Sequence, residues 1–324
     1  MNLLILSFGD PQTTASTRFR IGQYESNLSK LGIHMKFVKR SDVDRGVFKL
    51  IDQADVVINQ KCVLSPWIGS AIRSRAKRLI FDFDDAMWTR PGPDFSWLVR
   101  WRTSARLRWW LRAADVVTTA NGYLAAWAKP HARRLEIVPM TLDLDEWRPD
   151  PERAVSGHVT VGWAGSPAYI PLLERLEPAL AAACAQEPRL RLAVYSGRRP
   201  AWRIPFEYVP YAPGTEAAFV RKLDIGLLPM DDDPFGRGKS PIKALQYLAC
   251  GVPVVGRLVG AAHELVDESV GIPVTCAAEW TAAVVGLARD AAARRRLGDA
   301  GLARIRAHHD MQVQVERLLG ILHG

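Results

Sequence analysis

Short apolar segments alternate with longer amphipathic segments along this chain, and this alternation limits its fold more than any other feature. In the first half, the segments expected to form strands are Asn2–Ser7, His34–Lys39, Asp55–Asn59, Arg78–Phe83, Val116–Ala120 and Glu136–Val138. Helical stretches, such as Thr17–Leu31 and Ser96–Ala113, separate these segments. Strands that alternate with helices predict parallel sheets with helices on both faces.

The alternation begins again near residue 157. The strands expected in the second half are Val159–Trp163, Leu190–Ser196, Phe206–Val209, Ile225–Pro229, Pro253–Val255 and Ile272–Val274. Helical stretches, such as Tyr169–Ala183 and Pro241–Cys250, lie between them, and another amphipathic helix follows Asp310. The polar join Arg148–Glu152 contains two prolines, which make it stiff and non-helical.

We therefore predict an α/β protein with two doubly wound, Rossmann-like domains, residues 1–155 and residues 156–324, which face a cleft. The C-terminal helix could pack back on the first domain. A chain of 324 residues is long enough to give each domain a core of its own. The apolar run at the N-terminus is too short to span a membrane and lacks the preceding basic residues of a signal peptide.

The four cysteines are far apart in the sequence and show no spacing typical of metal ligands. They are Cys62, Cys184, Cys250 and Cys276. This pattern disfavours a structural zinc site or a disulfide framework, and it favours a reducing cytoplasm.

The net charge of +9 is unevenly distributed. Residues 1–155 hold 24 Lys and Arg against 17 Asp and Glu, whereas residues 156–324 hold 19 against 17. The basic first half suits nucleic acid, an anionic membrane or a phosphorylated acceptor, and composition does not choose among them. Because the sequence has no RRM, KH or zinc-finger signature, nucleic acid is not expected as a partner.

A glycine-containing polar loop separates two expected strands of the second half and leads into a helix. Ser240 suits the N-cap of this helix, and Pro241 suits its first turn. The start of a helix attracts anions, and Arg237 and Lys239 stand beside it. We expect an anion site here. The alternative is an ordinary strand, loop and helix with solvated basic residues.

Residues 246–255 read Gln-Tyr-Leu-Ala-Cys-Gly-Val-Pro-Val-Val. This stretch resembles the donor-site helix of retaining family-4 glycosyltransferases with the GT-B fold, which ends in a pattern like Glu-Ala-Met-Ala-Cys-Gly-Val-Pro-Val-Val. The resemblance implies that the substrate is a UDP- or GDP-linked sugar and that no cofactor is needed. It also implies that the diphosphate contacts Arg237, Gly238, Lys239 and Ser240, and that the ribose contacts Gln246.

Further stretches resemble the same family. Val159–Pro167 is similar to the first strand and glycine turn of the donor domain, so Gly165 and Ser166 are expected at the donor. Ala114–Asn121 and Ile137–Asp145 resemble the end of the acceptor domain.

The chain also departs from the family pattern. Its usual pair of glutamates falls on Gly238 and Gln246, and Asp232 or Asp233 could replace the first glutamate. The usual arginine and lysine after the glycine turn are missing, so Arg237 and Lys239 would have to supply the positive charge.

The Gly9–Asp10 loop and the helix start that follows it form a second candidate site. Thr17–Arg20 resembles the start of the family's first long helix. Gly9, Asp10, Arg18 and Arg20 are expected to contact the acceptor or a phosphate, because an arginine fork fits a phosphate. Solvated arginines are the alternative.

Three carboxylates, Asp82, Asp84 and Asp85, lie at the end of an expected strand. A DxD metal site of the GT-A kind is one interpretation. The phosphate-binding signals lie in the other half, however, and GT-B enzymes generally need no metal for catalysis. We expect no metal, and we expect Asp84 and Asp85 to bind acceptor hydroxyls or to assist proton transfer. Helix capping by either residue is the alternative.

Residues 97–112 contain five arginines and four tryptophans. A basic, tryptophan-rich helix can lie in a membrane interface. It can also pack on a sheet with its arginine stems covering apolar surface. We expect peripheral contact between this segment and an anionic membrane, on the cytoplasmic face.

These features together predict a hexosyltransferase of polysaccharide biosynthesis. Lys239 and Arg237 would stabilise the leaving diphosphate, and the family resemblance implies retention at the anomeric carbon. The acceptor would be a glycan, a lipid-linked acceptor or a small molecule. Another GT-B enzyme, namely a nucleotide-sugar epimerase or an inverting transferase, and a basic nucleic-acid-binding protein remain as alternatives.

Overall fold

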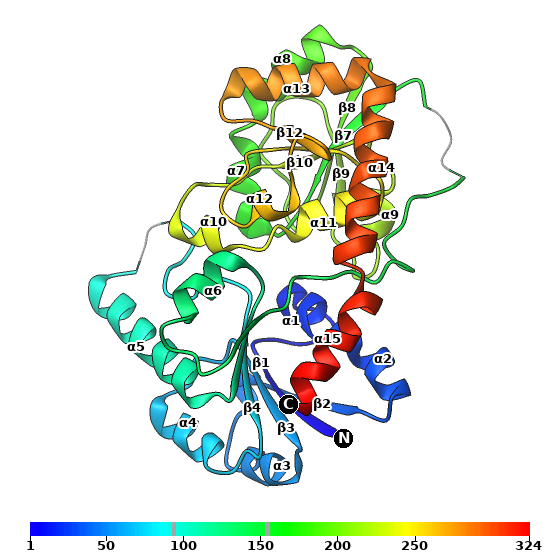
Figure 1. The fold of residues 1–324 in the computed structure, drawn as a ribbon. Coiled ribbons are helices and arrows are strands. Elements are labelled where there is room, and N and C mark those ends of the chain that lie inside the picture. Colours follow the sequence, from blue (N-terminus) through cyan, green and yellow to red (C-terminus); the bar gives the residue numbers. More distant parts are fainter. Residues whose placement is uncertain (93–94, 153–155) are drawn as a thin grey trace. The chain divides into compact units, whose positions relative to one another are not determined.

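A computed structural model describes residues 1–92, 95–152 and 156–324 of the chain (Figure 1). The chain divides into two compact units. The first unit contains Met1–Thr141, Asp233–Ser240 and Met311–Gly324, and the second contains Leu142–Asp232 and Pro241–Asp310. The predicted domain boundary at residue 155 lies outside the described residues.

The first unit is built on a parallel sheet of six strands in the order β2-β1-β3-β4-β5-β6. The strands are β1 (Asn2–Ser7), β2 (His34–Lys39), β3 (Val56–Gln60), β4 (Leu79–Phe83), β5 (Val116–Thr119) and β6 (Leu135–Ile137). The three strands β1, β3 and β4 consist mainly of apolar residues and are almost wholly buried, as expected for a sheet that is covered on both faces.

Helices cover both faces of this sheet. On one face, apolar side chains of β1 and β3, including Leu3 and Ile58, join a core with residues of α2 (Glu25–Lys30) and of α15 (Met311–His323). On the other face, Trp110 of α5 (Trp97–Ala113) stacks on Phe81 of β4, with ring centroids 5.8 Å apart. The remaining helices of residues 1–141 are α1 (Ala15–Arg20), α3 (Val47–Gln53), α4 (Pro66–Arg73) and α6 (Gly122–Ala128).

The second unit has its own parallel sheet of six strands, in the order β12-β11-β10-β7-β8-β9. The strands are β7 (Val159–Ala164), β8 (Leu190–Ser196), β9 (Glu207–Pro210), β10 (Ile225–Leu228), β11 (Val254–Gly256) and β12 (Gly271–Pro273). The helices are α7 (Ile170–Glu174), α8 (Glu177–Gln186), α9 (Glu216–Val220), α11 (Ile242–Ala249), α12 (Ala262–Leu265), α13 (Ala277–Arg289) and α14 (Ala291–His308).

The core of the second unit forms between its sheet and helices α7, α8 and α13. On the opposite face, Tyr247 of α11 lies directly against Gly226 of β10. A Cβ atom at Gly226 would come within 2.5 Å of the tyrosine ring, so this close packing requires glycine. The Tyr247 hydroxyl accepts a hydrogen bond from the Ala164 amide (3.0 Å), which fixes α11 to the end of β7.

The predicted fold class is confirmed: all twelve predicted strands are present, with ends within one residue of their predicted positions. Two helix predictions were wrong. The stretch predicted as one helix over Thr17–Leu31 is divided into α1, a 3-10 turn (Gly22–Tyr24) and α2, because glycine is a poor helix former. The stretch Tyr169–Ala183 is divided into α7 and α8, because Pro178 has no amide hydrogen to donate to the carbonyl of Glu174, where α7 ends.

No helix among the described residues is both long and apolar enough to cross a membrane.

Candidate functional site

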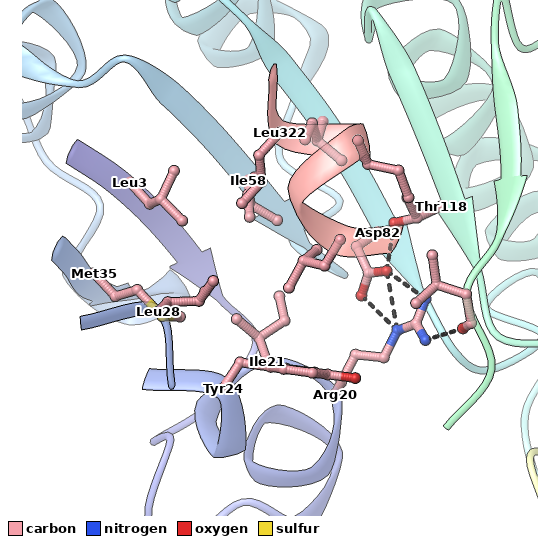
Figure 2. A pocket seen from close by; sticks show the side chains of 14 residues that line it. Leu3, Arg20, Ile21, Tyr24, Leu28, Met35, Ile58, Asp82, Thr118 and Leu322 are labelled. Atoms are coloured by element: carbon pink, nitrogen blue, oxygen red, sulfur yellow. Dashed lines mark hydrogen bonds and ion pairs between the residues drawn. The ribbon is translucent and has the colours of Figure 1, made fainter. Parts of the chain in front are cut away.

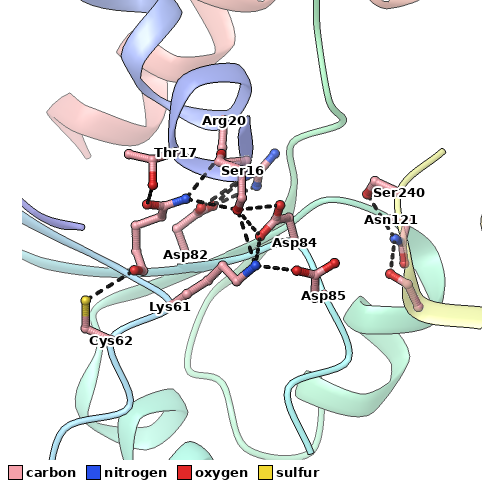
Figure 3. A network of polar contacts seen from close by, with 12 residues as sticks. Ser16, Thr17, Arg20, Lys61, Cys62, Asp82, Asp84, Asp85, Asn121 and Ser240 are labelled. Carbon is pink, nitrogen blue, oxygen red and sulfur yellow. Dashed lines mark hydrogen bonds and ion pairs between the residues drawn. The ribbon is translucent and has the colours of Figure 1, made fainter. Parts of the chain in front are cut away.

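A charged cluster lies at the carboxyl edge of the first sheet (Figure 3). The strands β1, β3 and β4 are parallel neighbours and end at Ser7, Gln60 and Phe83. The residues that follow, Phe8, Lys61 and Asp84, must therefore leave the sheet at the same edge. In doubly wound sheets this edge is where ligands bind.

Lys61 is the centre of this cluster. Its Nζ lies 2.9 Å from Asp84 Oδ1, donates to Asp85 Oδ2, and donates to Ser16 Oγ at 3.2 Å. Burial acts to lower the pKa of Lys61, but Asp84 and Asp85 outweigh burial, so the pKa lies above its usual value. Lys61 was not predicted as a site residue, although its position directly after a buried strand was a signal for it.

Asp84 and Asp85, which the sequence predicted as functional neighbours, both contact Lys61 but differ in their surroundings. Asp84 is buried and accepts hydrogen bonds from Ser16 Oγ at 3.1 and 2.9 Å. Burial raises the pKa of Asp84 above its usual value. Burial also acts to raise the pKa of Asp85, but Lys61 and then Lys239 outweigh it and lower that pKa to about 2.

The capping alternative for Asp84 and Asp85 is wrong. Residues 86–92 form turns and bends and contain no helix. Neither carboxylate has a helix start to cap, because the next helix in the described chain is α5.

Arg20 and Asp82 form a second, fully buried ion pair beside the cluster (Figure 2). Arg20 donates to Asp82 from Nη2 at 2.7 Å and from Nε at 3.0 Å, and its Nη1 donates to the Val138 carbonyl. Thr118 Oγ1 also donates to Asp82, at 2.6 Å. Both members of the pair are thus committed to contacts inside the unit. They border a cavity of about 30 Å³ with a mainly apolar lining, which includes Leu3 and Leu322.

The other residues predicted for the acceptor or a phosphate lie before and within α1. Asp10 accepts hydrogen bonds from the backbone amides of Gln12 (2.9 Å) and Thr13 (3.1 Å), which lower the pKa of its carboxyl. A Cβ atom at Gly9 would lie 2.3 Å from Thr14 Oγ1, so the loop folds tightly there. The Arg18 guanidinium lies over the ring of Phe19, 4.4 Å from its centroid.

The segment Asp233–Ser240 belongs to the first unit. Residues predicted as a loop form a short helix instead, α10 (Pro234–Gly238), because the Asp233 side chain caps it by accepting from the Gly236 amide at 2.6 Å. Asn121 holds the segment by donating to the Gly238 carbonyl (3.0 Å) and to Ser240 Oγ (3.4 Å). Figure 3 shows this contact.

The prediction that Ser240 caps the following helix was wrong. The N-cap of α11 is Pro241, and the Ser240 hydroxyl contacts Asn121 instead. Gly238 is required by its surroundings, since a Cβ atom there would lie 2.8 Å from the Ala86 methyl group. Arg237 is exposed, and Lys239 lies over the Phe235 ring and near Asp85.

The remaining residues predicted for the donor, Gly165, Ser166 and Gln246, belong to the second unit. Gly165 leaves room for Trp163, whose ring would come within 2.1 Å of a Cβ atom at residue 165. Ser166 is exposed at the start of a 3-10 turn. Gln246 is fully buried, and neither of its amide atoms has a hydrogen-bond partner among the described residues.

The aspartates at the end of β4 form ion pairs with basic side chains of the chain itself. Asp82 faces Arg20, and Asp84 and Asp85 face Lys61. In the described part of the chain, no group of three or more His, Cys, Asp or Glu side chains is arranged to hold a metal ion.

Comparison with known proteins agrees with this architecture. Residues 174–320 match the family model described as Glycosyl transferase-like. No curated protein matches the chain in sequence.

Among solved structures, the chain is similar to sucrose-phosphate synthase from Thermosynechococcus elongatus, with 18% identity, a TM-score of 0.76, and coverage of 99% of this chain and 98% of that one. It is also similar to Anabaena Alr3699/HepE in complex with UDP and glucose, with 16% identity, a TM-score of 0.72, and coverage of 100% and 99%.

A third similar structure is an alpha-glucosyltransferase (AGT) in complex with UDP, with 13% identity, a TM-score of 0.68, and full coverage of both chains. At such identities these likenesses establish the fold, and the family model adds the class of protein. The chain is a glycosyltransferase with the GT-B fold.

Proposed function

We propose that this glycosyltransferase moves a hexose from a UDP- or GDP-linked sugar to a glycan, a lipid-linked acceptor or a small molecule. The observation that carries the donor assignment is the buried amide of Gln246, which has no hydrogen-bond partner among the residues that the structure describes. A buried amide without partners costs about 1–3 kcal/mol, and ribose hydroxyls would supply both a donor and an acceptor to it. The complexes of HepE and AGT with UDP support a uridine nucleotide.

In this proposal Arg237 and Lys239 stabilise the charge that develops on the leaving diphosphate, while Gly238 and Ser240 contribute backbone contacts. Gly165 and Ser166 contact the donor from the turn after β7. Fixed charges aimed at a leaving group are usually the largest contribution to catalysis. Retention would follow if the acceptor attacks from the face that the leaving phosphate occupies, because that phosphate can then take the acceptor's proton.

The acceptor is proposed to bind at the charged cluster of the first unit. Asp85 is partly exposed and its pKa is low, so its carboxylate can accept a hydrogen bond from an acceptor hydroxyl. Gly9, Asp10 and Arg18, which lie close to α1 in the sequence, are proposed to contact the rest of the acceptor or its phosphate. Arg20 acts inside the unit, through Asp82.

We further propose that α5 contacts an anionic membrane on its cytoplasmic face. Trp97, Leu98 and Trp101 are exposed by 75%, 56% and 68%, and α5 contains five arginines and no acidic residue. Helix α4 contacts α5 and adds Trp67, which is 86% exposed. Exposed tryptophans beside arginines fit the boundary between lipid headgroups and acyl chains.

The proposed reaction can be tested by incubating the protein with UDP-glucose, UDP-N-acetylglucosamine and GDP-mannose, and by following free nucleotide and the anomeric proton by NMR. Release of UDP or GDP, with a new α-glycoside or free α-sugar as the first product, is the expected result. A first product with the β-configuration would indicate an inverting transferase. A donor converted to another nucleotide sugar, with no nucleotide released, would indicate an epimerase.

A further inference from the structure

Lys61 combines two features that cost free energy. Its φ angle is +59°, and it is the one non-glycine residue of the described chain with a positive φ. A side chain in this left-handed region strains the backbone, whereas glycine would adopt it freely. Its ammonium group is also buried, with a side chain only 7% exposed, and a buried charge is tolerated only when it is paired.

The contacts of Lys61 show what the strained backbone provides. The left-handed turn directly after β3 aims the side chain across the carboxyl edge of the sheet toward β4 (Figure 3). There Nζ contacts both Asp84 and Asp85, and it also reaches Ser16 of α1. One side chain thus joins three segments of the chain at the edge where the acceptor is proposed to bind.

We propose that Lys61 is a positioning residue that holds Asp84 and Asp85 in place and keeps the Asp85 carboxylate ionised to receive an acceptor hydroxyl. The inference rests on the proposed function, and it identifies the residue on which the acceptor site depends. Lys61 acts through the two aspartates and does not itself contact the reacting atoms.

The charges around the two carboxylates favour different roles. Asp84 faces Lys61, Asp85 and the more distant Arg20, and its burial raises its pKa. Asp85 faces Lys61 and Lys239, and these two cations keep its pKa low. Asp85 therefore stays ionised over the neutral range.

The test compares Lys61→Met with Lys61→Arg. A neutral side chain removes the positive charge that favours the ionised carboxylates, so the carboxyl pKa values rise. An opposite charge at this distance typically shifts a carboxyl pKa by roughly 1–3 units. In Lys61→Met, the acid-side loss of kcat/KM for UDP-glucose hydrolysis, with water as the acceptor, should move to higher pH by ~1 unit or more. Lys61→Arg should keep the wild-type pH profile.

The matched control is Arg73→Met. Arg73 also pairs with an aspartate of the first unit, Asp115, at 3.0 Å, but its side chain is 33% exposed and lies outside the cluster. This variant should leave the pH profile unchanged. If Lys61→Met lowers activity and stability while its pH profile matches that of the wild type, Lys61 is only a structural ion-pair partner and the inference is wrong.

A second measurement needs no substrate and separates this inference from the proposed function. Carboxyl ¹³C shifts of labelled aspartate should titrate at higher pH in Lys61→Met than in wild type for Asp84 and Asp85. If Lys61→Met does not fold, Asp84→Asn is added to it, because this change removes one of the two carboxylates that the loss of Lys61 leaves without a cation. The Asp85 titration in this double variant is then compared with the Asp85 titration in Asp84→Asn alone. Unchanged carboxyl titrations would overturn the inference even if wild-type transfer is demonstrated.

Discussion

Gln246 carries a primary amide that is fully buried and has no hydrogen-bond partner in the described part of the chain. We expect Gln246→Met to raise the free energy of unfolding of the nucleotide-free protein by about 1–3 kcal/mol, because an apolar side chain of similar size removes the unpaired groups. The same change should weaken nucleoside and nucleoside diphosphate binding by similar factors, because the ribose contact is common to both ligands.

The two effects can be measured by urea denaturation and by calorimetric titration. Gln186→Met, which changes an exposed glutamine at the end of α8, is the matched control and should change neither quantity. A Gln246→Met protein that is less stable than wild type, or that binds the nucleoside as tightly as wild type does, would show that the Gln246 amide does not serve to bind a ligand.

Arg20 and Asp82 form a buried pair whose members depend on each other. Arg20→Met should destabilise the first unit by about 3–5 kcal/mol, because it leaves the Asp82 carboxylate buried without its cation. Adding Asp82→Asn should restore most of the loss, since it removes that charge. Urea denaturation curves of the single and double variants test this expectation. A loss of less than 1 kcal/mol in the single variant would mean that Asp82 finds another partner.

Prediction from sequence at the residue scale succeeded where a residue's neighbours in the chain decide its position. Asp84 and Asp85 follow a buried strand, and the structure places them at its carboxyl end. Lys61 follows another strand, but its importance depends on contacts with residues more than twenty positions away, which no local pattern reveals. Ser240 is the reverse case, because a tertiary contact with Asn121 replaced the local capping role.

At the scale of elements, α5 is the helix whose surface is least explained by packing within the protein. Trp110 is buried against Phe81, whereas Trp97 and Trp101 near its N-terminus are exposed. We expect the protein to bind phosphatidylserine liposomes more tightly than phosphatidylcholine liposomes, and added salt should weaken this binding, because arginines near an anionic surface contribute about 1 kcal/mol each.

Flotation with liposomes measures this binding directly. The double change Trp97→Ala and Trp101→Ala should abolish most of it, whereas Leu31→Ala, which changes an exposed apolar residue in the loop before β2, should not. No binding of the wild type at low salt would mean that α5 is only a packed helix with a basic surface.

Strands were easier to predict than helices for a physical reason. The central strands are short runs rich in apolar residues and buried on both faces, so composition alone marks them, as in Leu3–Leu6. Helix ends depend on single residues instead. Pro178 and Gly22 interrupt amphipathic patterns that otherwise continue, and Asp233 starts a helix in a stretch that reads as a loop.

At the scale of the whole molecule, the predicted mechanism does not need a divalent ion. Transfer or donor hydrolysis should therefore continue in the presence of EDTA, because the aspartates at the end of β4 face Arg20 and Lys61, and cations of the chain itself are proposed to stabilise the diphosphate. Rates with and without the chelator measure this. Loss of activity in EDTA, followed by recovery with manganese, would restore the DxD interpretation of Asp82 and Asp84.

The central claim is that the protein binds a nucleoside diphosphate as part of a nucleotide sugar, and calorimetric titration with UDP, GDP and their nucleosides tests it most directly. We predict that UDP or GDP binds at one site, more tightly than its nucleoside. Lys239→Ala should lower the affinity for the diphosphate by roughly ten-fold or more but leave the affinity for the nucleoside unchanged, since a charge-assisted contact contributes about 1.5–3 kcal/mol. Lys222→Ala, an exposed lysine before β10, is the control. If neither diphosphate binds, or if Lys239→Ala binds it as wild type does, the account is contradicted.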